Sequence, residues 1–73
     1  MLSDIDRKVL RIIGNFSAGR KRLPTIDELC IKTGRSVAGI FDVLRVLAEQ
    51  EYIEWDRSQP DNIVLLEAWE RRG

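Results

Sequence analysis

The side chains with the clearest chemical potential in this sequence are its arginines and lysines. The densest group is the run Arg20, Lys21 and Arg22, and Lys32 and Arg35 follow in the next segment. Guanidinium and ammonium groups that gather on one surface can neutralise the phosphates of a nucleic acid backbone. A solvated loop is the alternative interpretation of the run at 20–22, and the sequence leaves both open.

Catalysis and metal binding have little support in the sequence. The chain has 73 residues, one cysteine and no histidine, which excludes a disulfide framework and the usual Cys/His zinc patterns. It also lacks the side chain that most often serves as a general base. We therefore expect no enzyme activity, no metal and no cofactor.

The charges balance overall but are unevenly distributed along the chain. Twelve basic and twelve acidic residues give a formal net charge of zero. Residues 1–45 carry a net charge of +4, whereas residues 46–73 carry a net charge of −4. A dipolar domain can present a basic face to DNA although its total charge is zero. Charge scattered over a solvated surface is the alternative.

The length suits one small domain, which buries only about 60% of its unfolded surface and so has a thin core. No apolar run approaches the ~18 residues of a membrane span, and the N-terminus "MLSDIDRKVL" does not resemble a signal peptide. A single free cysteine suits a reducing compartment. We expect a cytoplasmic protein without a membrane segment, with a domain over residues 1–66 and a tail or short helix over 67–73.

The first element that must position these side chains is a helix that begins after Ser3. The stretch "SDID" resembles a capping box, with Asp6 in the place where Glu is more usual. Gly14 and Asn15 indicate that the helix ends nearby, and residues 17–22 are expected to form a polar loop. The inward stripe has helical spacing and consists of Ile5, Val9, Leu10, Ile12, Ile13 and Phe16.

A second and a third helix are expected to follow as a pair. Thr25 is a good N-cap, and Glu28 three residues later completes a capping box, which predicts a helix over about 26–33. Gly34 supplies the left-handed residue that ends this helix. Ser36 then caps a helix over about 37–49.

The third helix has one strongly apolar face. Helical spacing predicts that this face is buried, and it consists of Val37, Ile40, Phe41, Leu44, Leu47 and Ala48. Val43 and Val46 flank the stripe. The outward surface would then consist of Ser36, Ala38, Gly39, Asp42 and Arg45.

That outward surface offers little polar chemistry. Arg45 is its one good hydrogen-bond donor to bases, and it comes late, whereas a reading helix usually contacts bases with its N-terminal residues. The small Ala38 and Gly39 would permit close approach to a DNA groove, and Ala38 and Val37 could touch thymine methyl groups. We expect weak base discrimination by this helix.

A hairpin is expected to close the domain. The alternating "YIEWD" and the apolar run "IVLL" predict two strands joined by the turn "RSQPDN". Arg57 and Gln59 of this turn could enter a minor groove, although Asp56 and Asp61 oppose that, and a plain solvent-exposed turn is the alternative. Trp69 would either close the core or contact a partner.

The stretch "TIDELCIKTGRSVAGIFDVLRVL" resembles the helix–turn–helix family, and with the hairpin the chain resembles a winged helix. It is most similar to the N-terminal DNA-binding domains of LexA repressors. The similarity rests on an opening helix of the "R-x-V-L-x-x-I" kind, on "LPTIDEL", "GRS" and "LRVLAEQEYIE", and on the closing apolar strand, over about residues 2–66. Two features depart from that family. Its turn is one residue longer, and its reading helix is polar where this sequence has Ala38, Gly39 and Phe41.

The resemblance implies a small α+β fold, a winged helix with a three-helix helix–turn–helix core and a C-terminal β-hairpin wing. It also implies a small prokaryotic or viral transcription regulator that places its third helix in the major groove of double-stranded DNA. Phosphates would be neutralised by Arg20, Lys21, Arg22, Lys32, Arg35 and Arg57, with Thr25 and the helix N-terminus that it caps adding a contact.

The partner remains open between DNA and protein. The alternative to DNA binding is a winged helix that serves as a protein-interaction module, with an exposed Val43–Val46 patch as its docking surface. A monomer would hold DNA weakly, so a homodimer is also expected, with Val43, Val46 or Trp69 at its interface.

Overall fold

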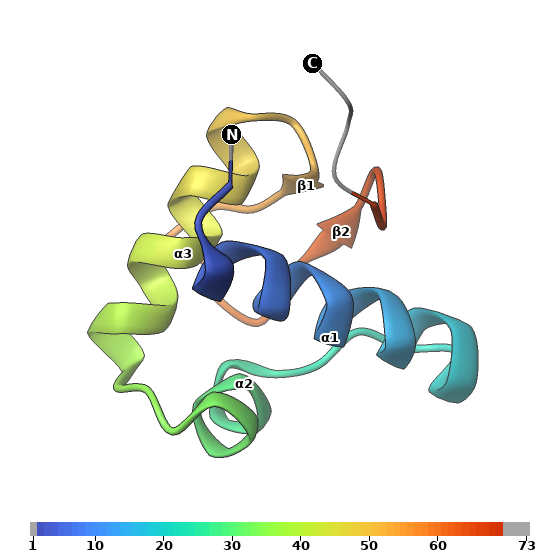
Figure 1. The fold of residues 1–73 in the computed structure, drawn as a ribbon, viewed down its shortest axis with the longest axis horizontal. Helices are drawn as coiled ribbons and strands as arrows, with labels where there is room; N and C mark the ends of the chain where they lie inside the picture. The colour runs from blue at the N-terminus through green and yellow to red at the C-terminus, as the bar shows by residue number, and fades with distance from the viewer. Residues whose placement is uncertain (1, 70–73) are drawn as a thin grey trace.

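Three helices and a short antiparallel hairpin make up residues 2–69, the part of the chain that the computed structural model describes (Figure 1). Helices α1 (Asp4–Arg20), α2 (Ile26–Thr33) and α3 (Val37–Glu49) precede strands β1 (Ile53–Glu54) and β2 (Val64–Leu65). The strands pair with Ile53 opposite Leu65 and Glu54 opposite Val64. The expected order of helix, helix pair and hairpin in a small α+β fold is confirmed.

The predicted capping residues hold the helix ends. Ser3 and Asp6 form a reciprocal capping box at the start of α1, and Thr25 and Glu28 form the equivalent box at α2. Gly34 ends α2 in the left-handed region with φ +69°, where only glycine is free of strain. The hydroxyl of Ser36 accepts a hydrogen bond from an amide in the first turn of α3. These short-range contacts explain why the bounds of α2 and α3 follow the sequence.

Helix α1 is longer than the sequence indicates. It continues through Gly14 and Asn15 to Arg20, so the expected end near Gly14 and the expected polar loop from residue 17 are wrong. Phe16 is buried one turn beyond Ile13, and burial of this ring favours continuing the helix. Gly14 has a packing role, because a Cβ there would lie 3.3 Å from the Ala68 Cβ.

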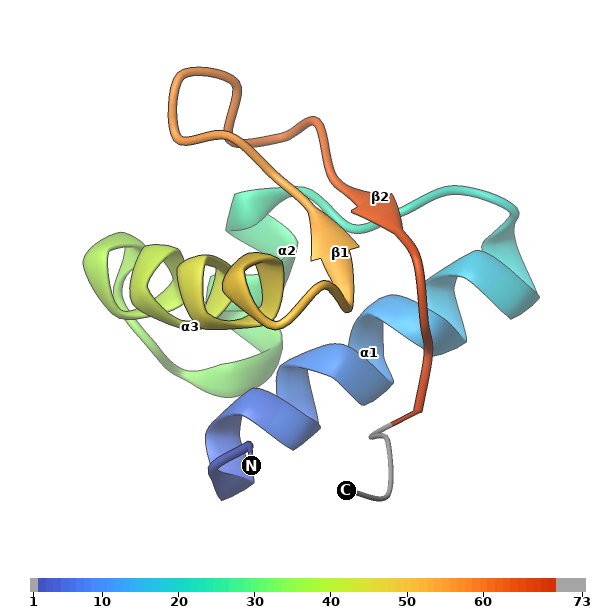
Figure 2. The same ribbon diagram turned by 90° about the horizontal axis from the view of Figure 1, so that it is seen from above.

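The core lies between α1, α3 and the hairpin, with α2 closing one side (Figure 2). Ile40, Leu44 and Leu47 of α3 are fully buried, as predicted. Val37 is 48% exposed, so its assignment to the buried stripe is wrong. The first residue of α3 lies at the end of the helix, where the other elements no longer cover it.

The hairpin has shorter strands and a longer connection than expected. Each strand has two residues, and the connection runs from Trp55 to Ile63. The indole N–H of Trp55 donates a hydrogen bond to the Pro60 carbonyl across this connection (2.9 Å). The Trp55 ring also meets Phe41 of α3 edge-on, with centroids 5.3 Å apart. Trp55 therefore ties the loop to α3 while packing against the core, as predicted.

The segment after β2 lies against α1, with Ala68 next to Gly14 (Figure 2). The amides of Leu66 and Glu67 both donate to the Tyr52 carbonyl. Residues 67–69 contain no helical turn, and Trp69 is 77% exposed, so Trp69 does not close the core. The remainder of the expected tail, 70–73, lies outside the described residues. None of the helices in the described part is long and apolar enough to cross a membrane.

Candidate nucleic-acid interface

The outward face of α3 carries the side chains that the sequence assigns to it. Ser36, Ala38, Asp42 and Arg45 are exposed, and Gly39 is half-buried. The amide of Gly39 donates a hydrogen bond to the Ser36 hydroxyl oxygen (3.1 Å), so this oxygen caps the N-terminus of α3. The outward face is therefore free of covering side chains and has small residues in its first turn.

Arg45 forms only a weak ion pair, with Glu49. Its guanidinium forms an i,i+4 ion pair with Glu49 at 3.3 Å, and both side chains are more than half exposed. Such exposed helical pairs contribute only about 0.3–0.5 kcal/mol. A base or phosphate could therefore replace Glu49 as the partner of Arg45 at little cost.

Two further arginines flank α3 without an ion-pair partner among residues 2–69. Arg35 precedes the helix and is exposed. Arg57 lies in the hairpin connection with its guanidinium carbon 5.8 Å from the centroid of the Phe41 ring. Arg57 and Arg45 also line one open groove, together with the half-buried Trp55. The same groove includes two acids, Glu49 and Asp56, so its charge is balanced.

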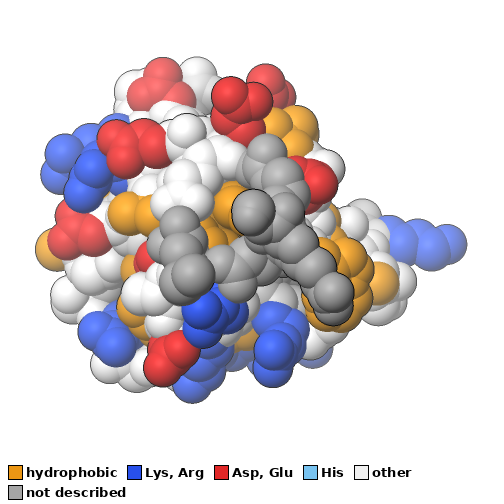
Figure 3. Space-filling view, turned by 45° about the horizontal axis from the view of Figure 1, so that its top comes forward, with side chains coloured by type: hydrophobic (Ala, Val, Ile, Leu, Met, Phe, Trp, Pro, Cys, Tyr) orange, Lys and Arg blue, Asp and Glu red, His pale blue; other side chains and the backbone are white. Residues whose placement is uncertain are grey.

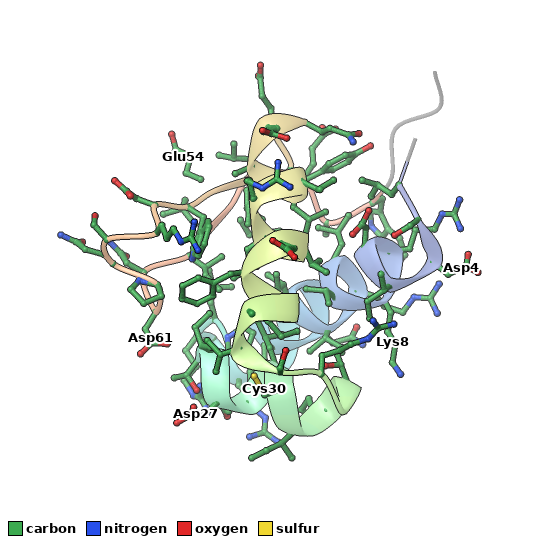
Figure 4. All side chains as sticks on the ribbon, turned by 90° about the vertical axis from the view of Figure 1, so that its left-hand side faces the viewer. Asp4, Lys8, Asp27, Cys30, Glu54 and Asp61 are labelled. Carbon is green, nitrogen blue, oxygen red and sulfur yellow. The ribbon has the colours of Figure 1, made fainter. Side chains whose placement is uncertain are left out.

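Lys8 lies beside this face, which the sequence did not predict. Figure 4 looks directly at α3, and Lys8 of α1 projects beside the helix on the side opposite the hairpin connection. Lys8 is exposed and has no ion-pair partner in the described part of the chain. Helical spacing places Lys8 on the solvent side of α1, but it gives no sign that α3 lies next to that side.

The hairpin connection is folded against the helices and does not extend into solvent as a free wing. The Asp61 carboxylate accepts a hydrogen bond from the amide of Ile26, the first residue of α2 (2.9 Å). The Gln59 side chain accepts from the Asn62 amide group (3.2 Å), and its backbone N–H donates to the Asp56 carbonyl. Arg57 and Gln59 remain exposed, but Gln59 already has an internal partner.

The N-terminus of α2 is a poorer phosphate site than expected. The amide of Ile26 is taken by Asp61, and the amide of Glu28 is taken by the Thr25 hydroxyl (3.3 Å). Asp27 and Glu28 add negative charge to the same turn. The phosphate contact expected through Thr25 and this helix N-terminus therefore loses two of its donors to protein oxygens.

The basic run at 20–22 makes internal contacts of its own. Both guanidinium nitrogens of Arg22 donate to the Glu28 carboxylate at 2.8 Å. This hydrogen bonding with Arg22, followed by the backbone N–H of Thr25, lowers the pKa of Glu28 to about 2. It also raises the pKa of Arg22.

Three cations surround the buried Phe16. The side chains of Arg20, Arg22 and Lys32 lie 4.9, 5.2 and 5.4 Å from the centroid of its ring. The C-terminal end of α1, which bears Arg20, and the N-terminal end of α3 lie at opposite ends of the molecule's 31 Å long axis (Figures 1 and 2). Because its ammonium group lies over this ring, the Lys32 side chain belongs with the cations at Phe16.

The sequence-predicted site thus separates into two groups. One group surrounds the outward face of α3 and consists of Arg35, Ser36, Ala38, Gly39, Asp42, Arg45, Arg57 and Gln59. The other group consists of Arg20, Arg22 and Lys32 around Phe16, together with Lys21 at the C-terminal end of α1. Figure 3 shows most acidic side chains in the upper part of one face and most basic side chains below them, in line with the uneven charge of the sequence.

The expected Val43–Val46 docking patch is absent. Val43 is 6% exposed and Val46 is partly buried against the core, because the apolar face of α3 is wider than the predicted stripe. The exposed apolar side chains near the α2–α3 turn are Ile31, at 81%, and Val37, at 48%.

The chain matches no protein-family model and no curated protein. Residues 2–69 contain no group of three or more His, Cys, Asp or Glu side chains that could hold a metal. The exposed surfaces described above supply cations, small side chains and aromatic edges, which are suited to binding.

Proposed function

We propose that this protein is a winged helix that binds double-stranded DNA through the outward face of α3. The observation that carries the proposal is the exposed outward face of α3, with its small first-turn residues, together with the cations around it. These are Arg35, Arg57 and Lys8, which have no ion-pair partner among residues 2–69. In this role the protein would regulate transcription in a prokaryote or a virus.

The geometry of the helix pair supports this proposal. A left-handed Gly34 and a capping Ser36 join α2 to α3, and Ile40, Leu44 and Leu47 bury the inner face of α3. A helix held in this way presents its N-terminal residues outwards, as reading helices do in major grooves. The hairpin next to α3 provides the second contact with the duplex backbone.

The distribution of side chains supports affinity more than discrimination between bases. Ala38 and Gly39 offer close approach and contact with a thymine methyl group, but no hydrogen bond from their side chains. Arg45 is the one base-reading donor of the face, and Asp42 disfavours phosphates close to it. Phosphate contacts would therefore dominate the binding, and such contacts carry little sequence information.

Salt dependence tests the proposal. If Arg35, Arg57 and Lys8 each neutralise one phosphate, the logarithm of the affinity for a random duplex should fall against log salt with a slope of about −2.7. We would measure fluorescence anisotropy of a labelled duplex between about 50 and 200 mM salt. Arg35→Ala and Arg57→Ala should each reduce the slope by about 0.9, and Lys21→Ala, at the other end of the molecule, should leave it unchanged.

Base discrimination has a separate readout. Arg45→Ala should change the sequences selected from a random duplex pool, whereas Arg35→Ala should weaken binding to all sequences alike. No detectable binding at low salt, or binding that ignores salt, would refute the DNA proposal.

A protein-interaction module is the second candidate function, and the exposure of Ile31 and Val37 favours it. These two apolar side chains lie at the α2–α3 turn, and a net charge of zero weakens the attraction to DNA. The two functions differ in one measurement, since Ile31→Asp should leave duplex binding by α3 in place and should abolish a protein contact at the turn. The absence of any duplex shift at low salt would favour this second function.

A further inference from the structure

Strand β2 has a free edge that faces an open groove. The groove is bordered by residues 63–65 on one side and by Ser17 and residues 21–23 on the other. Figure 1 shows β2 between β1 and the segment that leaves α1. No backbone hydrogen bond joins β2 to residues 21–23 in the described part of the chain. The groove therefore separates the strand from that segment.

The pairing of the hairpin determines which backbone groups face the groove. The amide of Leu66 donates to the Tyr52 carbonyl (2.9 Å), so residues 66 and 52 form a hydrogen-bonded pair. Hydrogen-bonded and non-hydrogen-bonded pairs alternate along an antiparallel ladder. The next pair, Leu65 with Ile53, is therefore of the second kind. The N–H and C=O of Leu65 consequently point away from β1, towards the groove.

The border of the groove opposite β2 is strongly basic. Lys21 and Arg22 line it directly, and Arg20 and Lys32 join Arg22 around the Phe16 ring. Among residues 2–69, Glu28 is the one carboxylate that pairs with these cations, through Arg22. Since Glu28 balances Arg22, Lys21 is the uncompensated cation among the residues that line the groove, with Arg20 and Lys32 around the nearby Phe16.

The geometry points to a binding site for an extended acidic segment of a partner protein, which adds a strand along Leu65 and sets a carboxylate against Lys21. An unpaired edge is a template for such strand addition, and its main-chain bonds provide affinity without specifying the partner's side chains. The excess positive charge of the groove selects a partner of opposite sign. This site is separate from the α3 face and would let the protein hold DNA and a partner at once.

Alternating peptides provide a direct probe of this site. A fluorescein-labelled peptide of alternating valine and glutamate should bind the full chain, and the matching valine–lysine peptide should not. N-methylation of the central amide of the acidic peptide removes one ladder donor and leaves every charge in place. We expect it to weaken binding about tenfold, which corresponds to the upper end of the net contribution of one hydrogen bond. Equal binding of the two acidic peptides would overturn strand addition.

Two variants test the same contacts from the protein side. Lys21→Glu should weaken binding of the acidic peptide at least about tenfold, and Lys8→Glu is the matched charge reversal on the α3 side that should not. Leu65→Pro removes the outward N–H of β2 at a position where proline is tolerated in an edge strand, and Leu65→Ala, which removes the same core-packing side chain but keeps the N–H, is its control. If Leu65→Pro fails to fold by circular dichroism, the methylated peptide still tests strand addition through the other bond of the ladder, which the peptide amide donates to the Leu65 carbonyl.

Duplex DNA is the competing occupant of this basic surface. We expect a random duplex to leave the bound peptide in place, and Lys21→Glu to retain duplex binding. Arg35→Ala should show the converse, with duplex binding weakened and peptide binding intact. If the duplex displaces the peptide and Lys21→Glu loses the duplex, the groove binds nucleic acid and the peptide proposal is wrong.

Discussion

Replacement of Gly14 by alanine tests how the segment after β2 lies on α1. A Cβ at Gly14 would lie 3.3 Å from the Ala68 Cβ, whereas a Cβ at Gly19, in the same helix, meets nothing within 4 Å. Gly19→Ala is therefore the matched control, since it gains helix propensity without meeting a neighbour. The comparison isolates the contact between α1 and Ala68.

The two opposing contributions can be estimated. Glycine to alanine inside a helix stabilises by about 0.8–1.0 kcal/mol. The 3.3 Å contact is tighter than an ordinary one, so Ala68 must move by a small amount. Ala68 is only half-buried and belongs to an irregular segment. We therefore expect the free energy needed to displace it to be smaller than the gain in helix propensity. Gly14→Ala should then stabilise the fold by about 0.5 kcal/mol, which raises Tm by about 2–4 °C.

Urea and thermal unfolding of four chains provide the assay: wild type, Gly14→Ala, Ala68→Gly and the double variant. In the double variant the close contact is absent, because Ala68→Gly removes the Cβ that the alanine at position 14 would meet. The two substitutions should therefore show a favourable coupling energy between positions 14 and 68. Destabilisation of more than about 1 kcal/mol by Gly14→Ala would show that the segment is held rigidly. The full helical gain without coupling would refute the packing of this segment on α1.

Three further perturbations act on the helix ends. Gly34→Ala places a Cβ at φ +69° and should destabilise the fold by about 1 kcal/mol in urea unfolding, because non-glycine residues are strained there. Ser36→Ala removes the cap of α3 and should also destabilise by about 1 kcal/mol, with Ser36→Asp as the capping control. Glu28 has a pKa of about 2 in the folded chain, lowered by hydrogen bonds from Arg22 and the Thr25 amide. Its folded pKa lies below its ordinary value of 4.5, so its contribution to stability is complete above that value and is lost as the pH falls towards 2. Glu28→Gln should flatten this part of the stability profile, and an unchanged profile would contradict the assignment.

Short-range signals account for the correctly predicted parts of the fold. The capping pairs at Ser3 and Thr25, the left-handed Gly34 and the cap at Ser36 each involve residues within three or four positions of one another. Their hydrogen bonds depend on local backbone geometry, so the sequence alone could predict them. The inner face of α3 followed in the same way from helical spacing.

The errors come from contacts that are distant in sequence. Gly14 suggested a helix end because glycine is a poor helix former, but its neighbour is Ala68, more than fifty positions away. Val43 is covered although it lies beside the predicted stripe. The division of the basic residues between two ends of the molecule followed from the unexpected length of α1, which carries Arg20 away from α3. No periodicity within a single helix contains that information.

The hydrogen bond from the Ile26 amide to Asp61 has a consequence for the order of folding. Helix α2 has eight residues, fewer than the ~12–15 that an isolated helix needs to be even marginally stable in water. The bond at its first amide comes from a residue 35 positions later. During synthesis, α2 and α3 would emerge from the ribosome well before Asp61 does. The helix pair should therefore remain loosely formed until the hairpin connection has been made, and then consolidate with it in one cooperative step.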